Sequence, residues 1–562
     1  MKQEAPPKRR GVVHSVYRAA RRAGAPPGGR RLQEKRASFM LQVGPPPPKR
    51  SSIPGSIVAG IMDTVQQQAE AVSYAPAPPE EFCGREEERG RLSAIISRAE
   101  EQGQAVMISG PSGIGKSSLL SWLAHEIRGR PGGLPVPVLR AEVFDLPGMI
   151  FAAFRELLND LRRSSASARF ASVLDVESMK EATRYADDVF EKYAAPVEPV
   201  GLLPKAGEEI IGVFARSPEV GYDRVYQAFE ELLRELGRQM SMTGHVAAVL
   251  LDDVHLASSH DRRLLQDVVR DLPPGILLAF TCRTEDGAGS GYATMQEEIR
   301  DFGIREVELH GMQKHEIQEL GERRFHFSID DAAAGILEER SSDPFSIMAC
   351  FNALRRRGLA PSRENIADVL AGAEGPVGLA FAALPESAKT WAENLCVLNP
   401  PFPVPVMACM LDLQGADVTP MTDRLQESGM FRRLPGGEYA FAHSLLQEHC
   451  RHDLSADTTV ALNARAADCF ERSIHRLPGR LYVLLSLADH LFHAREYEKA
   501  VDLNLEIGLR FHHRDDHDTA LMLTERAVAS AERLGDDALL AAAERQRDLI
   551  RQRASGPARP AR

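Results

Sequence analysis

The residues best suited to chemistry in this chain are consecutive, at positions 110–117. They read Gly-Pro-Ser-Gly-Ile-Gly-Lys-Ser, which satisfies the pattern G-x-x-x-x-G-K-S. Glycines allow such a loop to curl until several backbone N–H groups point at one spot, while the lysine adds a mobile cation and the serine hydroxyl a magnesium ligand. The pattern therefore predicts a nucleotide-phosphate loop made of Gly110, Pro111, Ser112, Gly113, Ile114, Gly115, Lys116, Ser117 and Ser118.

A phosphate loop needs a strand before it and a helix after it. Residues 105–109 form an apolar run of strand length, and residues 118–127 follow with a helical stripe of Leu119, Leu120, Leu123 and Ile127. A helix N-terminus at this point adds free N–H groups and a partial positive charge, both of which favour phosphate. The neighbouring sequence thus supports binding of a nucleoside triphosphate.

Two acidic residues far downstream complete the expected site. The nearly all-apolar run 245–251 is typical of a parallel strand buried on both faces, and it ends in Asp252 and Asp253. In a phosphate-loop enzyme the first carboxylate at this strand end orients the magnesium ion, and a neighbouring one can take the proton of the attacking water. We therefore expect Asp252, with Ser117, at the metal and Asp253 as the catalytic base.

Composition indicates an intracellular, multidomain globular protein. The chain has 562 residues, 43% of them hydrophobic and 26% charged, and this length predicts three or four domains. No apolar stretch approaches the length of a membrane span. The seven cysteines are scattered without a C-x-x-C pair, so we expect buried or free thiols in a reducing compartment and a cytoplasmic location.

The positive charge is concentrated at the start of the chain. Residues 1–50 hold 13 Lys or Arg against two Glu, a net of +11, which leaves −22 for the rest of a chain whose total is −11. This segment is rich in proline and glycine, so we expect residues 1–80 to be mostly disordered, with a short helix near residues 57–71. A solvated tail, a basic arm for nucleic acid, acidic lipid or an acidic partner, and an Arg-rich transit peptide all fit this composition.

Three segments together resemble a known family. They are the Phe-x-Gly-Arg-Glu stretch that starts at Phe82, the loop at Gly110, and Leu-Asp-Asp-Val-His-Leu-Ala at 251–257. In this order they resemble the STAND ATPases, the signal-transducing branch of the AAA-type ATPases. The resemblance places Gly84 and Arg85 among the nucleotide-binding residues. Ser258 stands where the bacterial subgroup has an acid, which leaves the metal site untouched.

Further matches to the family follow along the chain. Residues 276–283 read as a strand that ends in Thr-x-Arg, and the resemblance gives Arg283 the role of sensing the γ-phosphate. The Ser-Asp-Pro-Phe stretch at 342–345 is similar to a Gly-x-Pro-Phe motif, so Pro344 would close over the adenine, although Ser342 replaces the usual glycine. His443, in Phe-Ala-His-Ser-Leu-Leu, would contact the β-phosphate of ADP and hold a resting state. From the residues alone, His443 could equally be a packed core histidine.

The expected fold is a multidomain α/β plus α chain. A P-loop parallel α/β sandwich would carry helices on both faces and be followed by a helical lid, a winged helix and TPR-like helical hairpins. The Pro-Gly-Gly turn at 435–437 predicts the winged-helix hairpin. The predicted ranges are 1–80 for the tail, 81–305 for the nucleotide domain with a helical insertion at about 164–226, 306–358 for the lid, 359–455 for the winged helix, 456–553 for the TPR-like helices and 554–562 for a second tail.

These features predict a slowly hydrolysing ATP switch with Mg²⁺ as cofactor. By the family resemblance, ADP would hold it closed, whereas ATP would open it and favour a homo-oligomer, and the C-terminal helices would bind a protein partner. Two other functions remain open. One is a DNA-associated AAA ATPase of the initiator or loader kind, which the mixed charges of residues 420–455 do not favour. The other is a nucleotide-bound scaffold with little turnover.

Overall fold

The computed structural model describes a large part of the chain. The described residues are 82–129, 136–143, 184, 222–284, 304–372, 375–382, 384, 386–413, 423, 430–434, 437–474, 477, 481–513 and 516–554. The predicted tail with its helix, most of the insertion and the C-terminal tail lie outside these residues. None of the described helices is both long and apolar enough to cross a membrane.

A five-stranded parallel sheet lies at the centre of the nucleotide domain. Its order is β2-β3-β4-β1-β5. The strands are β1 (Gln104–Gly110), β2 (Val138–Glu142), β3 (Ala247–Asp252), β4 (Ile276–Arg283) and β5 (Arg305–Glu308). In the register Gly110 lies opposite Arg283, and Glu142 opposite Asp252. The polar residues at the carboxyl ends of these strands therefore meet at one edge, where open parallel sheets bind ligands.

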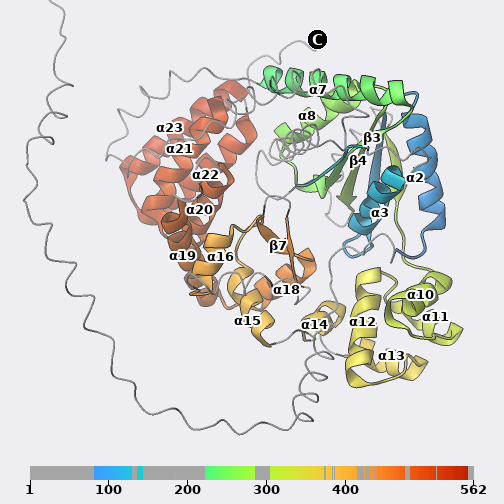
Figure 1. Cartoon of the computed structure of the whole chain (residues 1–562). Coiled ribbons are helices and arrows are strands. Elements are labelled where there is room, and N and C mark those ends of the chain that lie inside the picture. Colours follow the sequence, from blue (N-terminus) through green and yellow to red (C-terminus); the bar gives the residue numbers. More distant parts are fainter. Residues whose placement is uncertain are drawn as a thin grey trace, which may run out of the picture. The chain divides into compact units, whose positions relative to one another are not determined.

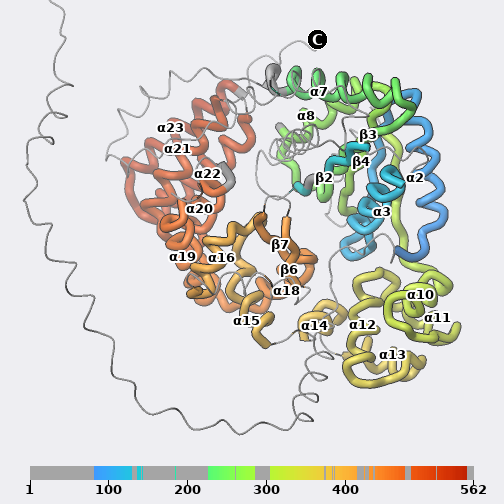
Figure 2. Tube along the Cα trace, in the orientation of Figure 1, coloured from blue at the N-terminus to red at the C-terminus, as the bar shows by residue number. Residues whose placement is uncertain are grey.

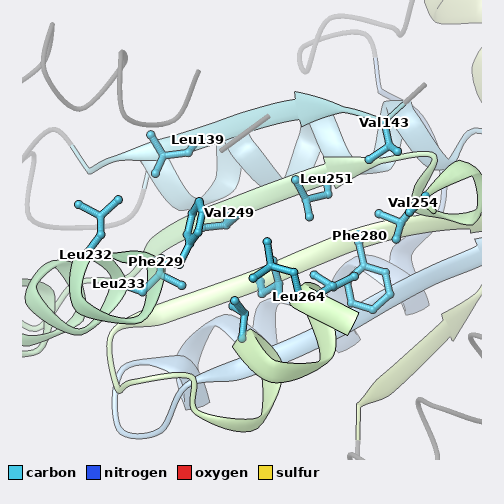
Figure 3. Packing of buried hydrophobic residues seen from close by; sticks show 14 of the residues in the cluster. Leu139, Val143, Phe229, Leu232, Leu233, Val249, Leu251, Val254, Leu264 and Phe280 are labelled. Carbon is cyan, nitrogen blue, oxygen red and sulfur yellow. The ribbon is translucent and has the colours of Figure 1, made fainter. Parts of the chain in front are cut away.

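Helices cover both faces of this sheet (Figure 1). On one face, α2 (Glu86–Ala99) and α3 (Lys116–Gly129) pack Ile96 and Leu123 against strand residues such as Ile108. On the other, α7 (Tyr222–Thr243) and α8 (Ser259–Arg270) contribute Phe229 and Leu264, which point toward the strands in Figure 3. Each such buried side chain stabilises the fold by roughly 1.5–3 kcal/mol. This packing fixes the strand ends that carry the site.

The helical lid follows the last strand of the sheet. It comprises α10 (Lys314–Leu320), a π-helical turn η4 (Gly321–Phe325), α11 (Asp331–Arg340), α12 (Pro344–Arg357) and α13 (Arg363–Leu370). The last of these helices lies beyond the predicted lid limit at 358, but it packs against α11 and α12. Asp343 caps α12 by accepting a hydrogen bond from the Ser346 N–H, and proline is favourable at the first helical position. Because β5 pairs with β1, the sheet extends to Glu308, beyond the predicted domain limit at 305.

The described residues of the winged-helix region form three helices and a hairpin, followed by a further helix. They are α14 (Gly375–Ala382), α15 (Glu386–Leu395), α16 (Val404–Met410), and the antiparallel strands β6 (Phe431–Arg433) and β7 (Tyr439–Phe441), followed by α18 (Ser444–Asp453). Phe431 pairs with Phe441 in the hairpin, as the Pro-Gly-Gly turn predicts.

Antiparallel helices complete the described chain (Figure 2). They are α19 (Ala456–Ser473), α20 (Leu481–His493), α21 (Tyr497–His513), α22 (His517–Leu534) and α23 (Asp537–Ala554), and each contacts the next. Small residues such as Ala500 and Ala520 are fully buried between them. This is the helical-hairpin arrangement that the sequence predicts.

One prediction about the cysteines is wrong. Cys409 in α16 and Cys469 in α19 form a disulfide, although we expected only thiols. Their separation of 60 residues gives no local signal, and the contact of α16 with α19 brings them together. The other five cysteines are free and buried, as expected.

Candidate nucleotide site

The phosphate loop runs from the end of β1 into the first turn of α3. Gly113 and Gly115 have φ values of 81° and 99°, a region that other residues rarely adopt. A Cβ on Gly113 would lie 3.0 Å from Asp343 Oδ1 at the start of α12. The loop therefore needs glycine both for its turn and for the close approach of the lid.

Lys116 is buried at the base of this loop. Its Nζ donates hydrogen bonds to the carbonyl oxygens of Gly110 (2.9 Å) and Pro111 (2.8 Å), and Lys116 is only 6% exposed. Its position on the first turn of α3 places a cation beside the N–H groups of the helix N-terminus. Such an arrangement favours an anion at the mouth of the loop.

Asp252 lies at the centre of a hydrogen-bonded acidic site. Thr281 Oγ1 donates to its Oδ1 (2.5 Å), and Arg140 Nη2 lies 3.2 Å from its Oδ2. Burial opposes ionisation of Asp252, yet Arg140 and the hydroxyls of Thr281 and Ser117 hold its pKa below the usual range. The carboxylate therefore stays ionised in the interior of the protein.

These residues fit a magnesium ion. Ser117 and Asp252 supply a hydroxyl and an ionised carboxylate that are in hydrogen-bonding contact with each other, and oxygen ligands of this kind are the ones that Mg²⁺ prefers. Ser117 and Asp252 would hold the ion, as the sequence predicts.

Asp253 has a different environment from its neighbour. Its backbone has a φ of 57°, and its N–H donates to Thr281 Oγ1 (2.8 Å). Burial and the adjacent charge of Asp252 raise the pKa of Asp253 to about 7, with Arg283 acting against them. Two neighbouring carboxylates with pKa values pushed apart are typical of sites in which one acid binds and the other exchanges protons.

Arg283 connects this acid to the winged helix. Its Nε lies 3.7 Å from Asp253 Oδ1, while its Nη2 donates to Ser444 Oγ (2.6 Å) and its Nη1 lies 3.6 Å from Glu448 Oε1. Ser444 and Glu448 belong to α18. The predicted γ-phosphate sensor is therefore in contact with both the nucleotide domain and the winged-helix region.

A cavity of about 190 Å³ joins these groups. The sequence-predicted residues that line it are Ser112, Gly113, Gly115, Lys116, Ser117, Ser118, Asp252, Asp253, Arg283, Pro344 and His443. A smaller and more apolar cavity of about 60 Å³ shares Gly115, Ser118, Arg324, Pro344 and Met348 with it, and is also lined by Phe82, Arg85, Ile114 and Met312. A polar cavity beside an apolar one suits a phosphate chain that ends in a flat base. Gly84, Gly110 and Pro111 line neither cavity.

Gly84 and Arg85 join the phosphate loop to the lid. The Arg85 N–H donates to Glu316 Oε1 (2.6 Å) in α10, and Arg85 Nη2 donates to the Ile114 carbonyl (3.2 Å). Gly84 has a φ of 67°, and a Cβ there would lie 2.5 Å from Glu316 Oε1. The contacts of these two residues are therefore with protein groups, although Arg85 also lines the apolar cavity.

His443 is the N-cap of α18 and lies between the lid and the nucleotide cavity. Its Nδ1 accepts a hydrogen bond from the Leu445 N–H (3.2 Å), and its ring lies 4.5 Å from that of Phe345. Burial, with Arg283 and Lys116 nearby, lowers its pKa to about 3. The imidazole is therefore neutral, and because Nδ1 accepts, its proton is on Nε2.

The sequence analysis missed four charged residues of the larger cavity, namely Arg140, Glu142, Arg324 and Arg432. Arg140 and Glu142 lie two apart on β2, so they point to the same side of the strand, and two charges on an otherwise apolar strand were a usable signal. Arg432 comes from the hairpin, 290 residues from Glu142. No local pattern indicates that contact.

Comparison with known families identifies the nucleotide domain. Residues 81–280 match the family described as an AAA ATPase domain. No curated protein matches the chain in sequence. The family match covers the phosphate loop and both acids, and it implies nucleotide binding.

Several solved structures are similar at low identity. A STAND protein with a tetratricopeptide repeat sensor from Pyrococcus horikoshii is 13% identical, with 86% of this chain and 66% of that one covered and a TM-score of 0.43, so this chain spans about two thirds of its length. A RuvB variant from Thermotoga maritima is 14% identical, with 68% and 99% covered and a TM-score of 0.28. The ORC2 protein of Aeropyrum pernix is 13% identical, with 66% and 94% covered and a TM-score of 0.31.

The matched residues place the phosphate loop at the edge of a parallel sheet. The chain carries an AAA-type P-loop ATPase domain over residues 81–280, which agrees with its resemblance to the STAND class.

Proposed function

We propose that this chain is a slowly hydrolysing ATP switch in which the bound nucleotide controls docking of the winged helix. One observation carries the proposal. The cavity at the phosphate loop is lined by Lys116 and Asp252 of the nucleotide domain and also by Arg432 and His443 of the winged-helix region. A nucleotide in this cavity would contact both, so its phosphates can favour one arrangement of the two over another.

The residues of the nucleotide domain suit hydrolysis. Lys116 would bind the β- and γ-phosphates, and Mg²⁺ held by Ser117 and Asp252 would neutralise charge that develops on them. Asp253 would take the proton of the attacking water. Arg283 would leave α18 to contact the γ-phosphate, and its planar guanidinium suits bidentate binding of phosphate oxygens.

His443 would stabilise the closed form when ADP is bound. Its neutral ring carries a proton on Nε2, so it can donate a hydrogen bond to the β-phosphate without the cost of burying another charge. Since His443 belongs to the winged-helix region, this bond would exist only while that region is docked. ATP would favour the undocked form, which would associate through the nucleotide domain, and hydrolysis would restore the closed form.

Nucleotide binding is tested with Lys116→Ala. Loss of the cation should abolish tight binding of ADP while the fold remains intact, because the Lys116 Nζ hydrogen bonds to Gly110 and Pro111 lie within the loop itself. Titration calorimetry with ADP measures this directly. Unchanged ADP affinity would show that the site assignment is wrong.

Hydrolysis is tested with Asp253→Asn. This variant should bind ATP as the wild type does yet hydrolyse it at least ~100-fold more slowly, which is the typical contribution of a positioned base. Asp368→Asn, an exposed change in the lid helix α13, is the matched control and should hydrolyse normally. If Asp253→Asn has no effect on a chain that keeps its nucleotide bound, the scaffold function is favoured.

A DNA-associated ATPase is the second candidate, and the basic segment 1–50 is the observation that favours it. It predicts salt-dependent duplex binding that disappears when residues 1–50 are removed. In the hairpin, Arg432 is already paired with Glu142, so this arginine is not presented to DNA in the docked form.

A further inference from the structure

A largely buried ion pair joins the winged-helix hairpin to the edge of the nucleotide site. Arg432 Nη2 in β6 donates to both carboxylate oxygens of Glu142, at the end of β2. The two side chains are 24% and 17% exposed, and both line the nucleotide cavity. An arginine that holds a carboxylate in this way fixes the position of both partners.

Arg432 also interacts electrostatically with Asp252, the acid that would bind the metal ion. Glu142 is opposite Asp252 in the pairing of β2 with β3, and Asp253 follows directly. Three carboxylates therefore lie together at adjacent strand ends, and the positive charge of Arg432 acts on all of them. Part of the charge that compensates these acids is supplied by the winged helix.

We propose that docking of the hairpin through Arg432 and occupancy of the metal position at Ser117 and Asp252 oppose each other. This inference rests on the proposed function, because it assumes that the site binds nucleotide and Mg²⁺. Glu142 acts as a positioning residue, and Arg432 makes the docked form selective for a metal-free nucleotide.

The opposition follows from charge. A divalent cation at Asp252 neutralises the same acidic cluster that attracts Arg432, and it places two like charges in a partly buried site, where charges are weakly screened. Once the hairpin undocks, Glu142 no longer has its arginine partner and adds its negative charge to the field at the metal position. Mg²⁺ would therefore promote undocking even with ADP, before any γ-phosphate is present.

The test uses full-length protein saturated with ADP and compares Arg432→Gln with Arg433→Gln. Arg433 is the next residue of β6 but is exposed, so it is a matched control. Arg432→Gln should bind Mg²⁺ on the order of tenfold more tightly in calorimetry, as expected for removal of one nearby like charge. Hydrogen exchange of Phe431–Arg433 and Tyr439–Phe441 should rise with Mg²⁺ in the wild type and in Arg433→Gln, and should be high without Mg²⁺ in Arg432→Gln.

Glu142→Gln distinguishes competition between Arg432 and Mg²⁺ from simple loss of the ion pair between Arg432 and Glu142. It should also release the hairpin and with it the charge of Arg432, but the site loses the negative charge of Glu142 at the same time, so Mg²⁺ affinity should stay below that of Arg432→Gln. Arg432→Lys, which keeps the charge, should show no gain in Mg²⁺ affinity and guards against misfolding of the Gln variant. Equal Mg²⁺ affinity in Arg432→Gln and Arg433→Gln would overturn the proposal. A wild type that binds no ADP would instead refute the proposed function itself.

Discussion

His443 both caps α18 and faces the nucleotide cavity, and substitution can separate these roles. Asparagine is a favourable N-cap, so His443→Asn should keep the melting temperature of the wild type. Its side chain is shorter than that of histidine, so it should not reach the β-phosphate of ADP. The variant should release ADP roughly 10- to 150-fold faster, which corresponds to a lost hydrogen bond to a charged group of about 1.5–3 kcal/mol. Release of a fluorescent ADP analogue and thermal unfolding measure the two effects. If His443→Asn released ADP at the wild-type rate, His443 would act only as a helix cap.

The low pKa of His443 predicts how stability varies with pH. Folding lowers this pKa from 6.5 to about 3, so between these values the unfolded chain binds a proton that the folded protein does not. Stability should therefore fall as pH decreases below about 6.5. Between pH 7 and 5 the nucleotide-free wild type should lose on the order of 1–2 kcal/mol through this group. Urea unfolding at both pH values should show that His443→Asn loses less free energy of unfolding than the wild type. Equal losses in the two proteins would contradict the low pKa of His443.

At the scale of elements, Glu316 joins α10 to the start of the nucleotide domain. Its carboxylate accepts hydrogen bonds from the N–H groups of Arg85 (2.6 Å) and Gln313 (2.8 Å). Glu316→Ala leaves both groups without this acceptor, so the free energy of unfolding should fall by about 2–4 kcal/mol. Glu322→Ala, an exposed change in η4, should be nearly neutral. Urea unfolding of both variants tests whether the two elements depend on this one side chain.

At the scale of the whole molecule, the switch predicts a size that depends on nucleotide. With ADP and without Mg²⁺ the wild type should elute as the smaller species on a sizing column, since docking of the winged helix keeps the molecule closed. Asp253→Asn with Mg-ATP should accumulate as a larger species, because it binds ATP but resets slowly. Light scattering coupled to the column measures both masses. An identical mass in both states would favour a scaffold that does not switch.

The sequence by itself determined the functional side chains whose positions follow from the order of strands and helices along the chain. The phosphate loop lies between a strand and a helix, and Asp252 ends a buried strand. Because parallel strands place their carboxyl ends at one edge, the order of segments is enough to bring Lys116, Asp252 and Arg283 together. The strand at 276–283 and the hairpin at Phe431 were likewise predictable from apolar runs and turn residues.

Only the tertiary structure decided which distant groups complete the site. Arg432 and Glu142 pair across 290 residues, and Cys409 and Cys469 join two helices that sequence reasoning could not place side by side. His443 could be recognised by resemblance, but its role as a helix cap became visible only in the structure. Such contacts depend on how packed surfaces meet, and the free energy of that packing is spread over many side chains instead of being encoded in any short segment.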